Sequence, residues 1–401
     1  MKIAHVVTTL YDTNATGWVT ALAGDQLARG CQVDLIVGHN ASPELMAERR
    51  AQGLGVFQVT TLRKYVRPVK EIQALLELYR LFRTERYDVV HTHLAKAGVI
   101  GRLAAKLAGV PRVIHSVYGA TFASTQPRVR RVFFRDLERL AGRATDAFIF
   151  VGRELQEAYC QARVCSPAKG QVIYYGKDLA PFLAMAGLSR EERRAQRQAL
   201  GLSENDIVLG NVSRLVPWKG HHVAVEVFVA LKEAFPTLKL IIVGDAKTPS
   251  EKAYKENLLR KVQRLGLEND IIFTGWVMDP ARYFAVFDLY LLTSMPLEGV
   301  PGAVIEAAVS GVPVVGFDCF GVREIPGVLA TLVPPQDTQA LTKALQTQLQ
   351  RLATDDCQNR PSTMAFQDQM RQQFNLGRMV QETWNVYHQI LGNGNRNGIC
   401  A

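Results

Sequence analysis

Two glutamates and neighbouring small residues make one segment the most suited to chemistry. Residues 297–315 read LEGVPGAVIEAAVSGVPVV, and seven residues separate Glu298 from Glu306. The segment joins a strand-like run to a helix-like run, so it would offer backbone N–H groups to an anion such as a pyrophosphate. Gly299 allows close approach of the backbone, and Pro301 is tolerated near a helix start. We expect Glu306 to bind ribose hydroxyls and Glu298 sugar hydroxyls. The alternative is two exposed glutamates favoured by the helix dipole.

A second segment, NVSRLVPWKG at residues 211–220, carries two cations. It follows a strand-like run and precedes an apparent helix. Arg214 and Lys219 would therefore project from the carboxyl end of a strand. There an arginine can bind phosphate oxygens in bidentate fashion, and a lysine adds a compact positive charge. The alternative is a pair of solvated loop cations. Because both segments belong to one predicted sheet, we expect the cations and the glutamates at the same edge.

Short apolar runs alternate with helix-like segments along the chain, which predicts an α/β protein with parallel sheets covered on both faces. The expected strands of the first half are Lys2–Thr8, Gln32–Val37, Val56–Thr60, Asp88–His91, Arg112–Ser116, Ala147–Val151 and Gln171–Tyr174. Those of the second half are Ile207–Val212, Leu238–Val243, Ile271–Thr274, Leu289–Leu292, Val312–Val315 and Thr331–Val333. These are too many strands for one compact sheet of usual size. We therefore predict two Rossmann-like, doubly wound domains that face each other across a cleft.

The expected domain boundaries follow the same pattern. An N-terminal domain of residues 1–175 precedes a charged linker at 176–205, and a second domain occupies 206–375. Residues 376–401 belong to a helical segment that we expect to pack back toward the N-terminal domain. No apolar run approaches the ~20 residues needed to cross a bilayer. The first apolar run reads as a strand and not as a signal peptide, so we expect a cytoplasmic protein.

Composition narrows the class of protein without choosing a ligand. Hydrophobic residues make up 48% and charged residues 21%, as in ordinary globular proteins. The formal charge of +10 suits phosphate-bearing ligands, anionic membranes or nucleic acid. No recognised nucleic-acid motif accompanies the basic clusters, so we expect no nucleic-acid partner. The six cysteines are scattered and lack metal-ligand spacing, which favours reduced thiols.

Together these motifs resemble glycosyltransferase family 4, a group of retaining enzymes with the GT-B fold. The resemblance rests on NVSRL and KG within 211–220, VGD at 243–245, FTGW at 273–276 and EGVP with EA at 298–307. Residues 89–119 look like the bacterial branch that assembles surface polysaccharides and lipid-linked glycans. The resemblance implies a nucleotide-sugar donor, with a UDP-sugar favoured, and a hydroxyl acceptor, with a lipid-linked one as a candidate. It implies no bound cofactor or metal.

The resemblance also implies roles for individual residues. Arg214 and Lys219 match the basic pair that neutralises the donor diphosphate, and Glu298 matches the carboxylate that orients the donor sugar. These three are the expected catalytic residues, because preorganised charges stabilise a leaving group as its own charge grows. The expected donor-binding residues are Gly17, Tyr118, Arg214, Lys219, Gly244, Glu298, Gly299, Val300, Pro301 and Glu306. The expected acceptor-binding residues are Asn14, Thr16, His93 and Lys96, the last of them in a KAG turn.

The chain departs from the family pattern at two places. Family members usually carry two adjacent glycines in the loop after the first strand, whereas residues 13–17 read TNATG. Tyr118 stands where close relatives commonly have a histidine that touches the transferring sugar; tyrosine is bulkier and does not titrate near neutral pH. These changes would alter sugar or acceptor choice, or mark a homologue that binds nucleotide sugars without turnover. A nucleotide-sugar epimerase is a further alternative, against which the basic pair and the two glutamates argue.

Two further features leave alternatives open. His91 and His93 lie two apart on a strand-like run and so face one side. A metal pair is one interpretation, but no third ligand is evident, and a polar cleft or core role is preferred. The segment Arg128–Arg143 interleaves arginines with apolar residues at helical spacing. It would be a basic amphipathic helix on anionic lipid, or a solvated helix whose apolar stripe packs on its own sheet and whose charge Asp136 and Glu138 dilute.

Overall fold

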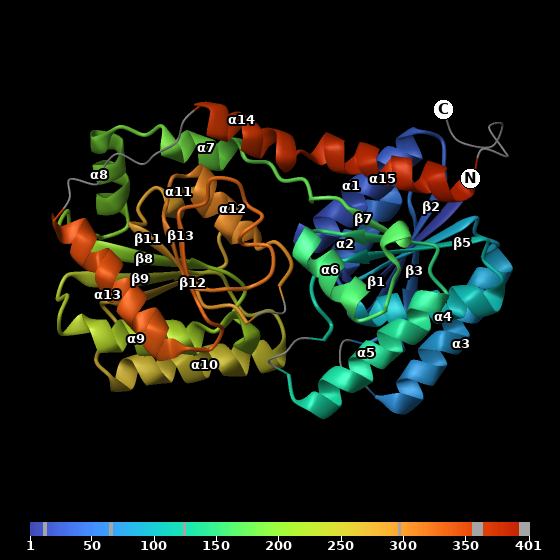
Figure 1. Ribbon diagram of the computed structural model, residues 1–401, viewed down its shortest axis with the longest axis horizontal. Helices are drawn as coiled ribbons and strands as arrows, with labels where there is room; N and C mark the ends of the chain where they lie inside the picture. Colours follow the sequence, from blue (N-terminus) through green and yellow to red (C-terminus); the bar gives the residue numbers. More distant parts are fainter. Residues whose placement is uncertain (11–13, 64–66, 123–125, 296–297, 355–363, 393–401) are drawn as a thin grey trace. The chain divides into compact units, whose positions relative to one another are not determined.

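The computed structural model of the chain describes residues 1–10, 14–63, 67–122, 126–295, 298–354 and 364–392 (Figure 1). It divides into two compact units. The N-terminal unit comprises Met1–Lys177 with Gln373–Ala401, and the C-terminal unit comprises Asp178–Gln372. Each unit contains one parallel sheet, so the α/β class with two Rossmann-like sheets is confirmed.

The N-terminal unit has a seven-stranded sheet in the order β3-β2-β1-β4-β5-β6-β7. Its strands are β1 (Lys2–Leu10), β2 (Gln32–Ala41), β3 (Gly55–Val59), β4 (Val89–His93), β5 (Arg112–Val117), β6 (Ala147–Phe150) and β7 (Gly170–Val172). All pairs are parallel. The strand order reverses between β1 and β4, and ligands of such sheets bind at the carboxyl ends of the strands beside this switch point.

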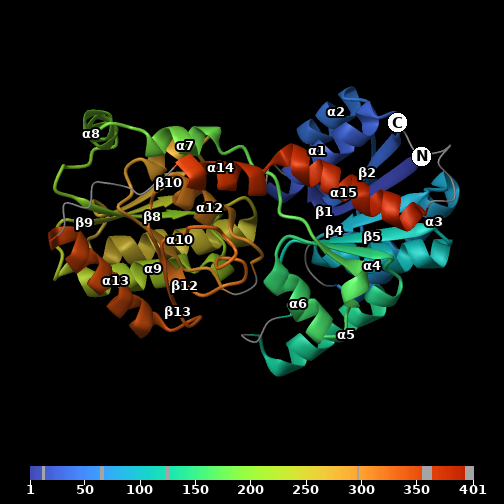
Figure 2. The same ribbon diagram turned by 45° about the horizontal axis from the view of Figure 1, so that its top comes forward.

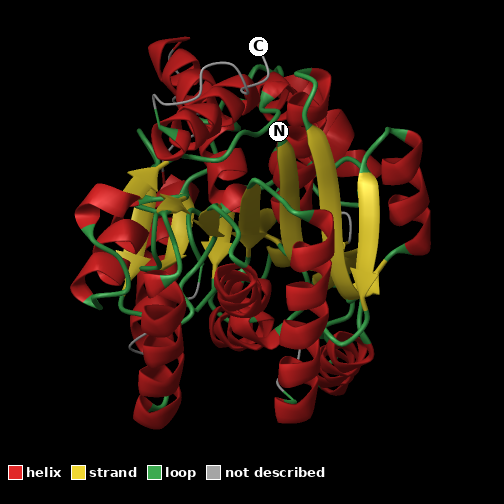
Figure 3. Cartoon of the chain, turned by 90° about the vertical axis from the view of Figure 1, so that its right-hand side faces the viewer, coloured by secondary structure: helices red, strands yellow, loops and turns green. Residues whose placement is uncertain are grey.

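Helices cover both faces of this sheet (Figures 2 and 3). They are α1 (Asn14–Ala28), α2 (Pro43–Ala51), α3 (Pro68–Glu85), α4 (Ala95–Ala108), α5 (Arg128–Arg143), α6 (Arg153–Gln161) and α15 (Leu376–Leu391). Helix α4 contacts α3 and α5, while α15 contacts α1. A core of small and branched apolar side chains fills the space between the sheet and α3 and α4, including Ala4, Val6, Leu78, Phe82, Val90 and Ala104. Burial on both faces explains why these strands read as nearly continuous apolar runs.

The C-terminal unit has a six-stranded sheet in the order β10-β9-β8-β11-β12-β13. Its strands are β8 (Ile207–Val212), β9 (Leu238–Val243), β10 (Ile271–Gly275), β11 (Leu289–Leu292), β12 (Val314–Phe317) and β13 (Ala330–Val333). Its helices are α7 (Ala180–Ala186), α8 (Arg190–Ala199), α9 (His221–Lys232), α10 (Pro249–Arg264), α11 (Ala281–Phe284), α12 (Gly302–Val309), α13 (Thr338–Thr354) and α14 (Met364–Gln373). The main core lies between the sheet and α9, α10 and α13. Here the strand order reverses between β8 and β11.

Three details concern segments singled out in the sequence. The segment expected as a linker carries α7 and α8, and α7 contacts α11 and α12. The final helical stretch is divided into α14 and α15, because the Asn375 side chain accepts a hydrogen bond from the Arg378 N–H at 2.8 Å and so begins a new helix. Among the helices of the described residues, none is long and apolar enough to cross a membrane.

Candidate functional site

The expected donor-binding residues of the C-terminal unit gather at the switch point of its sheet. Strands β8 and β11 are neighbours, with Leu289 paired to Leu209 and Tyr290 paired to Gly210. Arg214 follows the end of β8, and Glu298 lies in the loop after β11. Two loops that bear opposite charges therefore leave the same edge of the sheet side by side. This is the place where doubly wound sheets bind their ligands.

The loop after β8 is fixed to the loop after β11 by its backbone. The Thr293 hydroxyl donates to the Lys219 carbonyl at 2.8 Å, and the Met295 N–H donates to the Trp218 carbonyl at 2.8 Å. Gly220 has a φ of 71°, and a Cβ there would lie 2.1 Å from the Thr293 carbonyl oxygen. Only glycine tolerates this conformation and this approach. The position of the Lys219 backbone is therefore set before any ligand arrives.

Lys219 and Glu298, two of the expected catalytic residues, form an ion pair. Their side chains are 17% and 12% exposed, so water screens the pair only in part. The Lys219 ammonium also lies 4.5 Å from the centroid of the Trp218 ring, within the range of a cation–π interaction. A diphosphate that enters this edge would compete with the carboxylate for the ammonium. Glu298 would then be released to meet a hydroxyl.

Arg214 is held more loosely than Lys219. Its Nε lies 3.9 Å from Glu251 Oε1, and its side chain is one-third exposed. Glu251 itself is buried at the start of α10, where it forms a capping box with Thr248. The capping role fixes the Glu251 carboxylate, whereas the long ion pair leaves the guanidinium able to turn toward phosphate oxygens.

In the segment from Gly299 to Glu306, backbone groups lie before and at the start of α12, and the Glu306 carboxylate lies within the helix. Pro301 is the residue before α12 and has an extended conformation. Val300 is buried against Gly321, where an added Cβ would lie 2.7 Å from the Val300 side chain. The Val300 side chain is therefore packed inside, and its contribution to a ligand would come from its backbone. Glu306 is buried in α12, in the position expected from the sequence.

Gly244 directly follows β9 and lies against the backbone of Ser213 and Arg214, in the loop after β8. Its φ is 135°, and a Cβ there would lie 2.1 Å from the Ser213 carbonyl oxygen. The Ser213 hydroxyl is 2.9 Å from His221 Nε2. Burial, with a further contribution from the Lys219 charge, lowers the pKa of His221 to about 3, so this imidazole is neutral. The neutral imidazole adds no charge to the edge, whereas Arg214 and Lys219 do.

In the N-terminal unit the structure corrects two expectations about local conformation. Residues 14–17 lie in the first turn of α1 and not in a loop; polar residues favour a helix start, which accounts for the difference. Thr16 is buried, while Gly17 is exposed and has room for a Cβ. Thr13 and the Asn14 side chain lie outside what the structure describes. Lys96 lies in the first turn of α4, and its Nζ is 2.6 Å from Glu71 Oε1.

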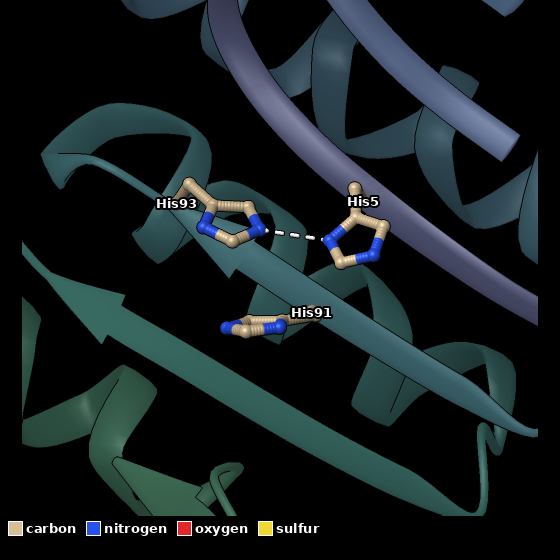
Figure 4. A group of neighbouring side chains, drawn as sticks. All are labelled: His5, His91 and His93. Carbon is tan, nitrogen blue, oxygen red and sulfur yellow. Dashed lines mark hydrogen bonds between the residues drawn. The ribbon is translucent and has the colours of Figure 1, made fainter. Parts of the chain in front are cut away.

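His91 and His93 have a histidine neighbour that the sequence analysis missed. They lie on β4, and their rings are 4.1 Å apart, as the spacing predicts. His5 of β1 is the register partner of His91 and completes a buried trio whose ring nitrogens lie within 4.8 Å of one another (Figure 4). A signal exists in the sequence, because β1 and β4 are the central neighbours of a doubly wound sheet and each carries a histidine.

The nitrogens of this trio are occupied by hydrogen bonds within the protein. His91 pairs through Nδ1 with the Tyr387 hydroxyl at 2.9 Å and through Nε2 with the Ser116 hydroxyl at 2.8 Å. His5 Nδ1 lies 2.9 Å from His93 Nε2. Burial lowers the pKa of His5 to about 4 and those of His91 and His93 well below their ordinary value. A metal ion would have to displace these partners, so we interpret the trio as a neutral polar network.

A narrow cavity lies beside this network at the carboxyl ends of the strands. Its volume is about 30 Å³, enough for a water or a single hydroxyl group. His93 and Tyr118 line it together with Trp18 and Tyr175, whose rings stack at 4.0 Å. Tyr118, an expected donor-binding residue, thus lies close to His93, an expected acceptor-binding one.

Comparison with known proteins defines the class. The family model described as "Glycosyl transferases group 1" matches residues 192–356, and the model described as "Glycosyltransferase Family 4" matches residues 17–180. Because the two models together cover most of the chain, the chain belongs to glycosyltransferase family 4 and is a glycosyltransferase. The prediction made from the motifs is confirmed.

Relatives and solved structures agree with this assignment. A UDP-Gal:alpha-D-GlcNAc-diphosphoundecaprenol alpha-1,3-galactosyltransferase of Escherichia coli is 29% identical over 76% of this chain and 78% of its own length. A capsular polysaccharide biosynthesis glycosyltransferase, CapM of Staphylococcus aureus, is 20% identical over 73% and 75%. The crystal structure of Anabaena HepE with UDP and glucose covers 96% of this chain and 99% of its own, with a TM-score of 0.74 and 24% identity. The fold is therefore GT-B, as predicted.

Proposed function

We propose that the C-terminal unit binds a nucleoside diphosphate sugar at the carboxyl ends of β8 and β11 and that the enzyme transfers the sugar to a hydroxyl acceptor with retention. The N-terminal unit would supply the acceptor site. The observation that carries the proposal is the meeting of Lys219 and Glu298, with Arg214 nearby, at the switch point of the sheet. This places two cations and a carboxylate where doubly wound sheets bind phosphates and their attached groups.

Each residue has a defined task in this reaction. Arg214 and Lys219 stabilise the diphosphate as it gains negative charge, with the N–H groups at the start of α12 adding to the same field. Glu298, once released from Lys219, accepts hydrogen bonds from the donor sugar, and Glu306 accepts them from the ribose. As the bond from the sugar to the phosphate oxygen breaks, that oxygen takes the acceptor proton, and the acceptor oxygen bonds the anomeric carbon on the same face.

We propose UDP as the nucleotide. The name of the Escherichia coli relative specifies UDP-Gal, and HepE has been crystallised with UDP, with UDP and glucose, and with UDP-glucose.

The experiment that tests UDP as the nucleotide measures the thermal stability of the purified chain with UDP, GDP and ADP. We expect UDP alone to raise the melting temperature, since a ligand at about 100 times its Kd adds roughly 2.7 kcal/mol. The Arg214→Ala variant should lose this shift. A larger shift with GDP or ADP would replace UDP in the proposal, and no shift with any of the three would favour a homologue without a donor site.

We further propose a lipid-linked acceptor and contact with an anionic membrane through α5, at the inner face of the plasma membrane. The name of the Escherichia coli relative specifies a diphosphoundecaprenol acceptor. On α5, Val129 is 84% exposed, Phe133 54% and Leu140 47%, so much of the apolar stripe does not pack on the sheet. Three arginines, Arg128, Arg130 and Arg143, are exposed on the same helix. Exposed apolar side chains flanked by arginines suit an interface of anionic lipid.

Liposome co-sedimentation tests this surface. We expect the chain to bind vesicles that contain anionic lipid and not neutral ones, and Phe133→Glu to weaken binding about tenfold, because it removes an apolar contact and adds repulsion. Leu259→Glu, at a partly exposed leucine of α10, is the matched control and should bind as the unaltered chain does. Equal partitioning to both vesicle types, or none, would reject the membrane contact and leave α5 as an ordinary solvated helix.

A further inference from the structure

A continuous line of buried side chains leads from α1 through two strands to Tyr118. Gln26 Oε1 lies 2.7 Å from His5 Nε2, His5 Nδ1 lies 2.9 Å from His93 Nε2, and His93 Nδ1 lies 2.9 Å from the Tyr118 hydroxyl. The first three residues are at most 1% exposed. The parallel pairing of β1 with β4 creates this line, since it sets His5 beside His91 and within reach of His93 (Figure 4).

With the Gln26 amide oxygen facing His5, as the structure places it, the chemistry of the remaining groups sets the direction of each hydrogen bond. A carbonyl oxygen can only accept, so His5 must donate to Gln26 through Nε2–H. A neutral imidazole carries one N–H, which leaves His5 Nδ1 as an acceptor and makes His93 donate through Nε2–H. His93 Nδ1 is then an acceptor in its turn. The Tyr118 hydroxyl hydrogen must therefore point into His93, and its oxygen, which also interacts with the Ser116 hydroxyl, keeps a lone pair for a further donor.

We infer that Gln26, His5 and His93 are positioning residues, which hold the Tyr118 hydroxyl so that its oxygen acts as a hydrogen-bond acceptor for a ligand hydroxyl. The inference rests on the proposed function, in which Tyr118 contacts the transferring sugar. The cavity of about 30 Å³ in front of His93 and Tyr118 has room for one such hydroxyl. Tyr118 then favours a ligand group that can donate a hydrogen bond. The buried line of hydrogen bonds fixes the orientation of the phenol hydroxyl before the ligand binds.

The double-variant cycle of His5 and Tyr118 tests the inference in the enzyme. Tyr118→Phe and His5→Gln should each lower kcat/KM about tenfold, the value of one hydrogen bond. Combined, they should cost no more than Tyr118→Phe alone, because both remove the same contact. His5→Asn should retain activity, since its side-chain oxygen reaches the place of Nδ1, whereas the glutamine oxygen reaches that of Nε2. Additive losses would show that His5 supports only the fold and would overturn the inference.

The matched control is His115→Gln. This imidazole is also buried in the same sheet, but its hydrogen bonds go to Thr92 and not to the line. His115→Gln should lose about as much stability as His5→Gln. In the His115→Gln background, Tyr118→Phe should lower kcat/KM by the same factor as in the unaltered chain. A change in that factor would contradict the specific role of the line.

A second measurement needs neither turnover nor a variant at His5. In ¹⁵N spectra of the labelled chain, His5 and His93 should both show the neutral Nε2–H tautomer, and Tyr118→Phe should shift the His93 Nδ1 signal. An Nδ1–H tautomer at either residue would overturn the inference even if sugar transfer is found. The expected tautomers in a chain that transfers no sugar would uphold the line and count against the proposed function alone.

Discussion

Replacing Lys219 with alanine should lower kcat/KM for sugar transfer about 10²- to 10³-fold. The side chain lies at the switch point of the C-terminal sheet, is 17% exposed, and has its backbone fixed by the Thr293 and Met295 hydrogen bonds. A preorganised donor aimed at developing negative charge is worth about 3–4 kcal/mol when the site excludes water. The loss should fall mainly on kcat, because the leaving diphosphate carries more charge in the transition state than in the bound donor. Initial rates over a range of donor concentrations measure the split.

The matched control is Lys239→Ala. Lys239 also forms an ion pair, with Asp270 at 2.8 Å, and its exposure is similar at 21%. It lies at the start of β9, whereas the site is at the carboxyl ends of the strands. This variant should keep full activity. A Lys219→Ala enzyme with unchanged kcat would remove Lys219 from the leaving-group role and leave it as the partner of Glu298.

Much of the fold is predictable because parallel strands that are buried on both faces appear in the sequence as short, mainly apolar runs. Strands β8, β9 and β11 have the predicted bounds, since each is a mainly apolar run between polar turns, interrupted by Asn211 in β8 and Lys239 in β9. Strand β4 continues beyond the predicted end at His91 because Thr92 and His93 are polar yet buried. The Thr92 hydroxyl donates to the Ile114 carbonyl at 3.3 Å, and this bond offsets its burial. The pattern of hydrophobic residues does not reveal a buried hydrogen bond of this kind.

The candidate site is predictable in its location and not in its contacts. Residue types and strand order suffice to bring Arg214, Lys219 and Glu298 to one edge. The ion pair of Lys219 with Glu298 depends on the left-handed turn at Gly220, which is a property of the folded loops. His5 escaped attention because it lies within an apolar strand and its partner is 88 residues away in the sequence. Contacts of that kind follow from register, which the sequence specifies only through the whole sheet.

A buried ion pair attaches α5 to the rest of the N-terminal unit. Arg102 of α4 and Glu138 of α5 are 0% and 1% exposed, and Arg102 Nη2 lies 2.6 Å from Glu138 Oε2. The guanidinium also donates through Nε to the Gly98 carbonyl at 2.7 Å and faces the Phe148 ring. Glu138 is therefore neutralised inside the protein and does not dilute the charge of the exposed face, contrary to the expectation from sequence. Asp136 does lie outside, where it pairs with Arg135 and Arg139.

Glu138→Ala should destabilise the N-terminal unit by about 3–5 kcal/mol, because it leaves the Arg102 charge buried without a partner. For a unit of this size the melting transition should fall by roughly 10 °C, as calorimetry would measure. The double variant Arg102→Met with Glu138→Leu should recover most of this loss, since well-packed apolar residues often replace a buried pair at little cost. Asp136→Ala is the exposed control on the same helix and should leave the transition unchanged. If the double variant melts as low as Glu138→Ala, the unpaired charge does not explain the loss, and the ion pair itself holds α5 on α4. If the double variant recovers stability, the loss in Glu138→Ala comes from the unpaired Arg102 charge, and apolar packing between α4 and α5 can replace the ion pair.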